Sequence, residues 1–279
     1  LPRAITVSAA PQSKVYGEAD PALSYTITSG ALAGSDAFSG SLSREEGNTA
    51  GTYAITQGNL ALNGNYNLTY TGNNLTITPK TLTASLTGTV SKVYDGTTAA
   101  TLASTNYTLS GIVGTDNVSL NHPAEGTYDN ANVGTNKTVT VEGLTLSGPA
   151  AGNYTLAATT INNTVGTITS RAVAVTAAAK TKVYGDVDPA LSYTITSGSL
   201  AGSDTFSGSL SRDAGNTVGT YAITQGNLAL NGNYTLTYTG NNLTITPKTL
   251  TASLTGTVSK VYDGTTAATL ASTNYTLSG

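Results

Sequence analysis

A long internal duplication constrains the fold of this chain more than any other feature of the sequence. Residues 14–111 recur as residues 182–279 with an offset of 168 residues, and the two copies differ at only eight positions. Near-identity over such a length is typical of a tandem array, in which one structural unit is copied along the chain. We therefore expect separate, repeated modules.

A weaker repeat divides the 168-residue period into two module types. Three short motifs occur in both halves: Lys-Val-Tyr at 14–16 and 92–94, Gly-Ser/Thr-Asp at 34–36 and 114–116, and Asn-Tyr at 65–66 and 153–154. The sequence predicts four modules: short modules at 3–79 and 171–247, a long module at 80–170, and a truncated long module at 248–279.

The modules are predicted to consist of β-strands. Apolar and polar residues alternate in five segments of the first short module: 23–28, 38–42, 53–56, 66–71 and 75–78. A period of two places one set of side chains inward and the hydroxyl groups outward. No helical period is present, and we expect at most a short turn at 30–36, with Asp36 in an Asx-type turn. The expected fold is all-β, with β-sandwich or β-grasp-like modules.

The connections between modules are short and contain a proline. Residues 77–82, Ile-Thr-Pro-Lys-Thr-Leu, lead from one module's last strand to the next module's first. Pro79 fixes φ, and no Gly/Ser linker is present, so we expect an elongated, semi-rigid rod. Modules of this size have small cores, and neighbours should stabilise one another. Residues 248–279 lack counterparts of 112–170 and should be poorly ordered or packed in a non-native way.

The composition excludes several classes of function. Charged residues make up only 10% of the chain, the net charge is -3 and the pI is about 5.0, which disfavours nucleic acid as a partner. No apolar run approaches the ~18 residues of a membrane helix, so we expect no membrane insertion by this segment. Cys, Met and Trp are absent, which excludes thiol chemistry and favours an exported protein. Leu1 is not a start methionine, and we interpret residues 1–2 as the tail of a preceding module.

Few residues are candidates for chemistry. The only histidine, His122, precedes a proline in a polar segment and is interpreted as a surface-loop residue. Acidic residues between strands offer paired carboxylates or calcium ligands in principle: Asp20, Asp36, Glu45 and Glu46. The best calcium candidates share a Gly-Ser/Thr-Asp context: Asp36, Asp116 and Asp204. No closely spaced acidic run accompanies them, so we predict no catalytic residue, no cofactor and no metal site.

The 16 tyrosines are interpreted mainly as core residues, with aromatic platforms for sugars as the alternative. Four of them sit at a strand end before a Gly or Asp-Gly turn and are predicted to be structural anchors: Tyr16, Tyr94, Tyr184 and Tyr262. Asn-x-Ser/Thr triplets are interpreted as a result of composition, with glycan attachment as the alternative; examples are Asn74, Asn106, Asn153 and Asn242.

An ordered set of motifs resembles two known domain families. Lys-Val-Tyr-Gly-x-x-Asp-Pro, Gly-x-Leu-x-Arg, Gly-Thr-Tyr-x-Ile and Asn-Tyr-x-Leu follow one another in residues 14–77 and 182–245, which resemble the MBG domain of YGX type. Residues 92–169, which begin Lys-Val-Tyr-Asp-Gly-Thr, resemble the YDG domain. The resemblance implies all-β modules of large bacterial surface or secreted adhesins, including filamentous-haemagglutinin-like exoproteins. It brings no catalytic residues.

Three hypotheses about function follow. The first is a structural repeat stalk of a bacterial surface or secreted adhesin, which projects a binding region for attachment or biofilm formation. Its partners would be a host or abiotic surface, or a glycan, bound through other regions of the full protein. The alternative is that the repeats are low-affinity glycan-binding or self-associating modules that act by avidity. The third is an enzyme, or a rod whose joints stiffen on binding calcium.

Overall fold

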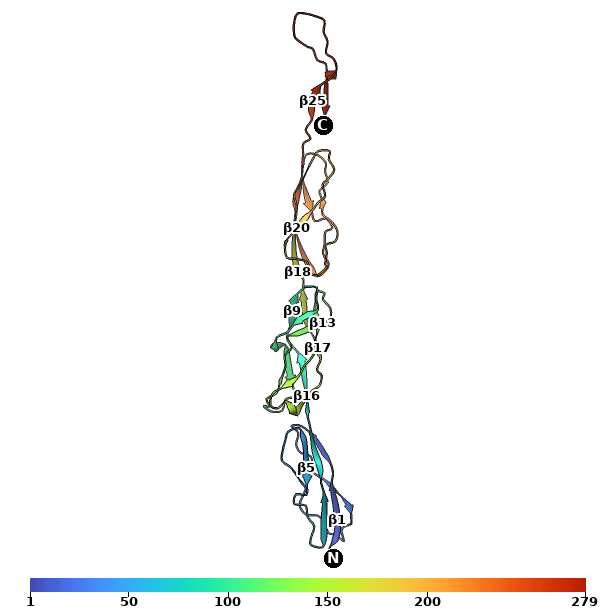
Figure 1. Ribbon diagram of the computed structural model, residues 1–279, viewed down its shortest axis with the longest axis vertical. Coiled ribbons are helices and arrows are strands. Elements are labelled where there is room, and N and C mark those ends of the chain that lie inside the picture. The colour runs from blue at the N-terminus through green and yellow to red at the C-terminus, as the bar shows by residue number, and fades with distance from the viewer. The chain divides into compact units, whose positions relative to one another are not determined.

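The computed structural model describes all 279 residues, and its regular structure consists of β-strands with three short 3-10 turns (Figure 1). The chain forms two compact units, residues 1–92 with 97–168, and residues 93–96 with 169–279. Each sheet draws all its strands from one of the four predicted modules. The predicted all-β tandem array is therefore confirmed.

The first short module contains two small sheets. Its strands are β1 (Arg3–Ala9), β2 (Gln12–Val15), β3 (Tyr25–Ser29), β4 (Ser43–Arg44), β5 (Gly51–Thr56), β6 (Tyr66–Thr71) and β7 (Asn73–Thr78). The strand orders are β3-β1-β6 and β2-β7-β5-β4. The first two strands of the module thus lie in different sheets, and so do the last two.

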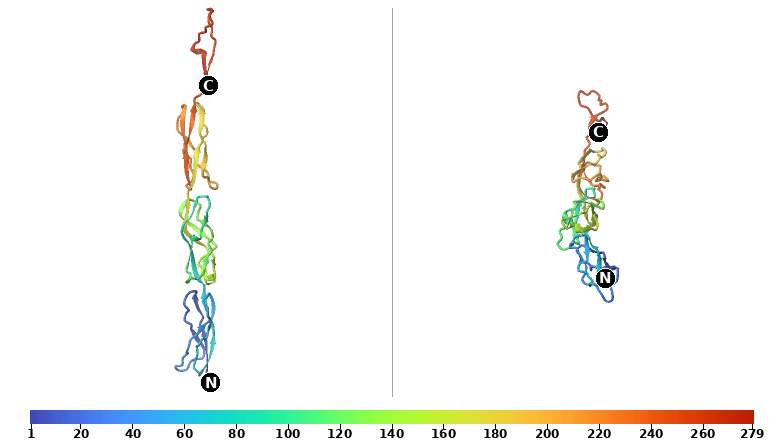
Figure 2. Two further views of the ribbon diagram at one scale, coloured as in Figure 1. Left: turned by 90° about the vertical axis from the view of Figure 1, so that its left-hand side faces the viewer. Right: turned by 60° about the horizontal axis from the view of Figure 1, so that its bottom comes forward.

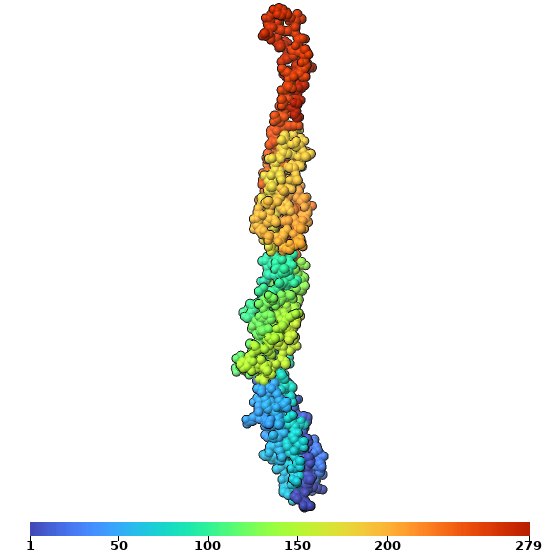
Figure 3. All heavy atoms as spheres, in the orientation of Figure 1, coloured from blue at the N-terminus to red at the C-terminus, as the bar shows by residue number.

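The beginning and the end of this module run side by side in both sheets. β1 pairs in parallel with β6, starting at Arg3 opposite Tyr66, and β2 pairs in parallel with β7, starting at Gln12 opposite Leu75. Both pairs have the same register. The segment between β1 and β2 and the segment between β6 and β7 therefore cross from one sheet to the other at matching positions. Figures 2 and 3 show the dark-blue first strand against the cyan last strand. One continuous parallel pairing therefore spans the module.

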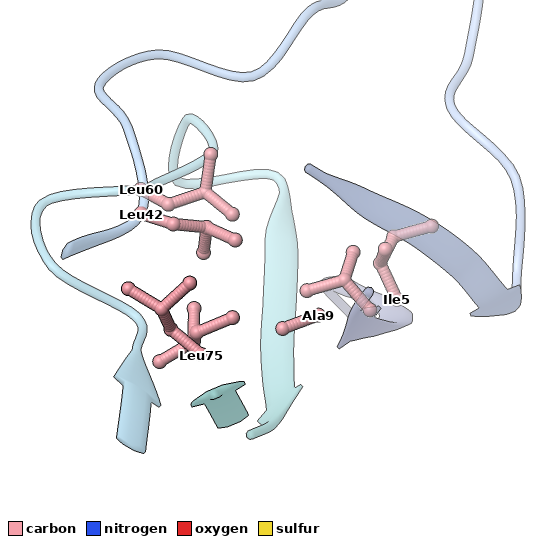
Figure 4. Packing of buried hydrophobic residues seen from close by; sticks show 7 residues of the cluster. Ile5, Ala9, Leu42, Leu60 and Leu75 are labelled. Atoms are coloured by element: carbon pink, nitrogen blue, oxygen red, sulfur yellow. The ribbon is translucent and has the colours of Figure 1, made fainter. Parts of the chain in front are cut away.

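The core of the first short module lies between its two sheets. Its buried side chains come from the alternating positions of the strands and from the loops beside them: Ile5, Val7, Ala9, Leu42, Ile55, Leu60 and Leu75 (Figure 4). The two faces enclose these side chains as in a sandwich, with polar side chains outward. No α-helix crosses either sheet, and the two sheets of this module are arranged like those of a sandwich.

Two local predictions for this module are wrong. Residues 38–42 form no strand, only an isolated bridge between Ser39 and Ala61. Gly40, which follows Ser39, has φ +73°, and a Cβ at this position would lie 2.1 Å from the carbonyl oxygen of Asn59. The backbone therefore bends at Gly40, where the alternating pattern predicted an extended strand. A turn does form at 33–36, but the carboxylate of Asp36 takes no part in an Asx-type turn and instead accepts hydrogen bonds from distant side chains.

The second short module repeats this plan. Its strands are β18 (Arg171–Ala177), β19 (Lys180–Val183), β20 (Tyr193–Ser197), β21 (Ser211–Arg212), β22 (Gly219–Thr224), β23 (Tyr234–Thr239) and β24 (Asn241–Thr246). The orders β20-β18-β23 and β19-β24-β22-β21 match those of the first module. The near-identical sequences therefore offer matched sites for comparison within one chain.

The long module enlarges the same plan. Its elements are β8 (Lys80–Leu86), β9 (Val90–Val93), β10 (Ala99–Thr101), η1 (Ser104–Asn106), β11 (Tyr107–Ser110), β12 (Ser119–Leu120), β13 (Glu125–Tyr128), β14 (Gly134–Val141), β15 (Leu146–Ser147), η2 (Ala151–Asn153), β16 (Tyr154–Leu156) and β17 (Ile161–Thr169). β8 pairs in parallel with β16, and β9 neighbours β17. The first strands again lie beside the last strands.

Residues 248–279 keep the strand pairing of a long module but not its packing. β25 (Thr251–Leu254) pairs with β26 (Tyr275–Ser278), which follows η3 (Ser272–Asn274), in the register that β8 adopts with β11. Leu254 is 65% exposed, whereas its counterpart Leu86 is 2% exposed. The tail is thus a native-like strand pair without a core.

Candidate functional site

The turn after the second strand of each short module is held by a lysine and an ion-pair network. Glu18 N donates to Val15 O at 3.1 Å, and Gly17 has φ +87°, a conformation that favours glycine. Lys14 Nζ donates to the carbonyl oxygen of Glu18 at 3.0 Å and to Asp20 Oδ1 at 2.6 Å. These bonds fix the turn that carries the predicted anchor Tyr16.

An arginine completes this network from another strand. Arg44 Nε donates to Asp20 Oδ2 at 2.6 Å, and Arg212 makes the same bond to Asp188 in the second short module. The guanidinium and the lysine ammonium lower the pKa of both aspartates to about 2. The carboxylates therefore stay charged throughout the neutral and mildly acidic range.

Tyr16 leaves its own module and docks on the long module. Its hydroxyl donates to Asp116 Oδ2 at 2.8 Å, and the hydroxyl of Tyr154 donates to the same oxygen at 2.5 Å. The two rings form a T-shaped pair with centroids 5.4 Å apart, and Val113 N donates to the Tyr154 hydroxyl. One carboxylate thus joins a tyrosine from each of two modules.

Tyr94 of the long module docks on the second short module in the same way. Its hydroxyl donates to Asp204 Oδ2 at 2.9 Å, Tyr234 donates to that oxygen at 2.7 Å, and the rings are again T-shaped at 5.4 Å. Ala201 N donates to the Tyr234 hydroxyl, and Arg171 Nη1 donates to the carbonyl oxygen of Tyr94. Residues 93–96 consequently belong to the second compact unit.

We call each of these arrangements a tyrosine joint, formed by a docking turn (residues 16–17 or 94–96) and a socket. The hydrogen bonds to Asp116 and Asp204 raise the pKa of Tyr16 and Tyr94, because the neighbouring carboxylate disfavours a second anion. The tyrosines therefore remain neutral donors, which is the form that the joint requires.

Close packing supports the first joint. A Cβ on Gly17 would lie 2.6 Å from Val113 Cγ2, so only glycine allows the turn to approach the socket. A Cβ on the counterpart Gly185 would have no atom within 4 Å. A second contact, from Ala50 N to Asn153 Oδ1 at 2.8 Å, joins the same two modules.

The anchor prediction therefore divides into two cases. Tyr94 is buried, at 6% exposure, and Tyr16 is half-buried, each docked on a following module. Tyr184 is 49% exposed and Tyr262 is 93% exposed. Neither of these two tyrosines contacts a socket aspartate among the 279 residues.

The aspartates considered as calcium candidates have a different role. Asp116 and Asp204 are the shared acceptors of the joints, and Asp36 accepts from Tyr66 at 2.8 Å and from Asn63 at 3.1 Å. No group of three or more His, Cys, Asp or Glu side chains is placed so that it could hold a metal ion. The co-occurrence of Gly-Ser/Thr-Asp and Asn-Tyr in the two short modules and the complete long module was the signal for the socket.

Four other candidates lie apart from the joints. His122 is exposed in a loop, with its ring 5.2 Å from that of Tyr107. Glu45 accepts from Ala54 N at 3.2 Å, and Glu46 is exposed on the same loop. Among the Asn-x-Ser/Thr triplets, Asn106 accepts from Ala103 N within its own turn. The structure brings none of these residues to a socket.

The fold and the joints define a class: an all-β protein of tandem modules that couple through tyrosine-bearing turns. Comparison with known families agrees with this class. The model of the MBG domain (YGX type) matches residues 5–76 and 173–244, and that of the YDG domain matches residues 78–161. Because the two MBG matches cover more than half of the chain, it belongs to the MBG domain (YGX type) family.

Both families are repeat-type domains of adhesin-like proteins, and neither is known as an enzymatic family. No curated protein matches the chain. None of the structure's helices has the length and apolar character needed to cross a membrane.

Replacing Tyr16 by Phe should destabilise the long module, whereas the same change at Tyr184 should not. Tyr16→Phe keeps the ring but removes the donor to Asp116, a loss of about 1 kcal/mol or more. For modules of this size that lowers the Tm by about 4–8 °C in calorimetry. Tyr184→Phe is the matched control, with the same Lys-Val-Tyr-Gly sequence and an exposed side chain. Equal effects of the two changes would contradict the joint.

Acid should weaken the short modules through Asp20 and Asp188. Their folded pKa of about 2 lies below the ordinary value of 3.8, so the unfolded chain binds more protons and stability is lost as the pH falls from about 4 to 2. Asp188→Asn should lower the Tm at pH 7 and flatten this acid dependence. Glu46→Gln, at an exposed loop position, serves as the control. If the Tm of Asp188→Asn fell with pH as steeply as that of the unchanged chain, the ion pairs would not contribute to the stability of the module.

Proposed function

We propose that this chain is a segment of the structural repeat stalk of a bacterial surface or secreted adhesin, and that the stalk projects a binding region for attachment or biofilm formation. The tyrosine joint carries the proposal. It recurs at two successive module boundaries with the same donor, acceptor and ring geometry, although the two docking turns differ in sequence. A stalk needs such a contact, because the distance that it spans depends on each module keeping a constant orientation to the next one.

The backbone connections favour the same function. β7 ends at Thr78 and β8 begins at Lys80, so only Pro79 lies between the strands of two modules. At the next boundary only Ser170 separates β17 from β18. A connection of one residue beside a docked tyrosine leaves little freedom for bending. We therefore keep the expected semi-rigid rod as part of the proposal.

The parallel pairing of first and last strands suits a chain under tension. In the first short module β1 and β2 run parallel to β6 and β7 over its whole length. A pull on the two ends of the module draws these strands past each other, so their hydrogen bonds are loaded together and do not open one at a time. This arrangement supports a load-bearing role.

The partners and location belong to the same proposal. A host or abiotic surface, or a glycan, would be bound through other regions of the full protein, and the segment would lie outside the cell. The adhesin-like families and the absence of cysteine support this location. In the alternative, the repeats themselves bind glycans or self-associate, but many tyrosines that would form sugar platforms are buried or docked, among them Tyr94, Tyr107 and Tyr154.

Small-angle X-ray scattering of the whole chain tests the proposal. We expect an extended particle with little flexing, and increased flexing when Tyr16 and Tyr94 are both replaced by Ala. A compact or freely flexing wild-type particle would contradict the stalk. Repeat-dependent binding on a glycan array would favour the alternative function.

A further inference from the structure

The first short module presents an exposed socket with the geometry of a docked one. Tyr66 donates to Asp36 Oδ2 at 2.8 Å, Ala33 N donates to the Tyr66 hydroxyl at 2.8 Å, and Asn63 donates to Asp36 Oδ1 at 3.1 Å. The matching distances in the docked socket around Asp204 are 2.7, 2.8 and 3.1 Å. The socket is thus organised without a docking turn, and binding would require little rearrangement.

The two sockets differ in exposure. Ala201 and Tyr234, beneath the docking turn of residues 94–96, are 5% and 9% exposed. Their counterparts Ala33 and Tyr66 are exposed and half-buried. The surface that the turn covers in one short module is therefore open to solvent in the other, although the sequences there are nearly identical.

We propose that the socket formed by Ala33, Asp36 and Tyr66 binds a Tyr-Asp-Gly turn from a long-type module that precedes it in the full protein. This inference rests on the proposed function and names the partner of its joint. The phenol would donate to Asp36 Oδ2 as Tyr94 does to Asp204. Arg3, the counterpart of Arg171, would donate to the tyrosine's carbonyl oxygen.

The socket selects this type of turn by size. The long module's socket has Val113 against Gly17, whereas the short module's socket has Ala201 at the corresponding place, 3.6 Å from a Cβ built on Gly96. The smaller alanine leaves room for the Asp-Gly turn of a long module. Ala33 is identical to Ala201, so the exposed socket fits the same turn.

A chain extended at its N-terminus tests the proposal. Residues 80–168 are added directly before Leu1, which places Arg3 in the sequence position that Arg171 occupies. Tyrosine nitration by tetranitromethane is then followed by peptide mass spectrometry at Tyr66 and Tyr234. The peptides are distinguishable, because residue 67 is Asn and residue 235 is Thr.

We expect Tyr66 to react severalfold faster than Tyr234 in the 279-residue chain and at the same rate as Tyr234 in the extended chain. Replacing the added module's docking tyrosine by Ala should restore the fast reaction of Tyr66. Tyr94→Ala in the original chain is the positive control, since it should expose Tyr234 in the same way.

Undiminished nitration of Tyr66 in the extended chain, with Tyr234 still protected, would overturn the proposal. A second outcome is protection of Tyr66 that increases with the concentration of the 279-residue chain and is lost in Tyr262→Ala. It would show that the docking turn comes from a second copy of the chain, and it would overturn the proposal that the turn comes from a preceding module of the same chain. The result is separable from that of the stalk proposal: protection of Tyr66 establishes docking even where scattering shows a flexing particle, and its failure refutes docking even where scattering shows a rod.

Discussion

A single carboxylate oxygen that accepts hydrogen bonds from two tyrosines is the interaction on which the rest of this structure depends. A hydrogen bond to a charged group contributes about 1.5–3 kcal/mol, and a T-shaped ring pair about 0.5–1.5 kcal/mol more. Such amounts are large for a module of under 90 residues, whose small core makes it marginally stable. Each joint therefore affects both the stability of a module and its relation to the next one.

The Lys-Val-Tyr motif now has a physical explanation. The lysine holds the turn, through Glu18 and Asp20 in the first short module and through the Thr97 carbonyl oxygen in the long module. The tyrosine docks on the next module, and a glycine with positive φ lets the turn approach closely. Residues that resemble candidates for chemistry thus serve the geometry of the array.

The sequence predicted much of the fold but little of the joint. Strands β6 and β7 and the inward positions of Ile55 and Leu75 follow from a period of two, which is a local signal. Tyr16 and Asp116 are 100 residues apart, and no local pattern relates a tyrosine in one module to an aspartate in another. Asp116 and Asp204 were for this reason considered as calcium ligands. The strand expected at 38–42 was wrong because alternation cannot report the bend at Gly40.

The most direct test of the account is the spread of distances across one joint. The chain has no cysteine, so Thr26→Cys and Thr155→Cys would supply the only two sites for spin labels, one in each module flanking the first joint. Double electron–electron resonance should give a narrow distance distribution that broadens clearly when Tyr16→Ala is added. A distribution of the same width with and without Tyr16 would contradict the claim that the tyrosine joint holds neighbouring modules together.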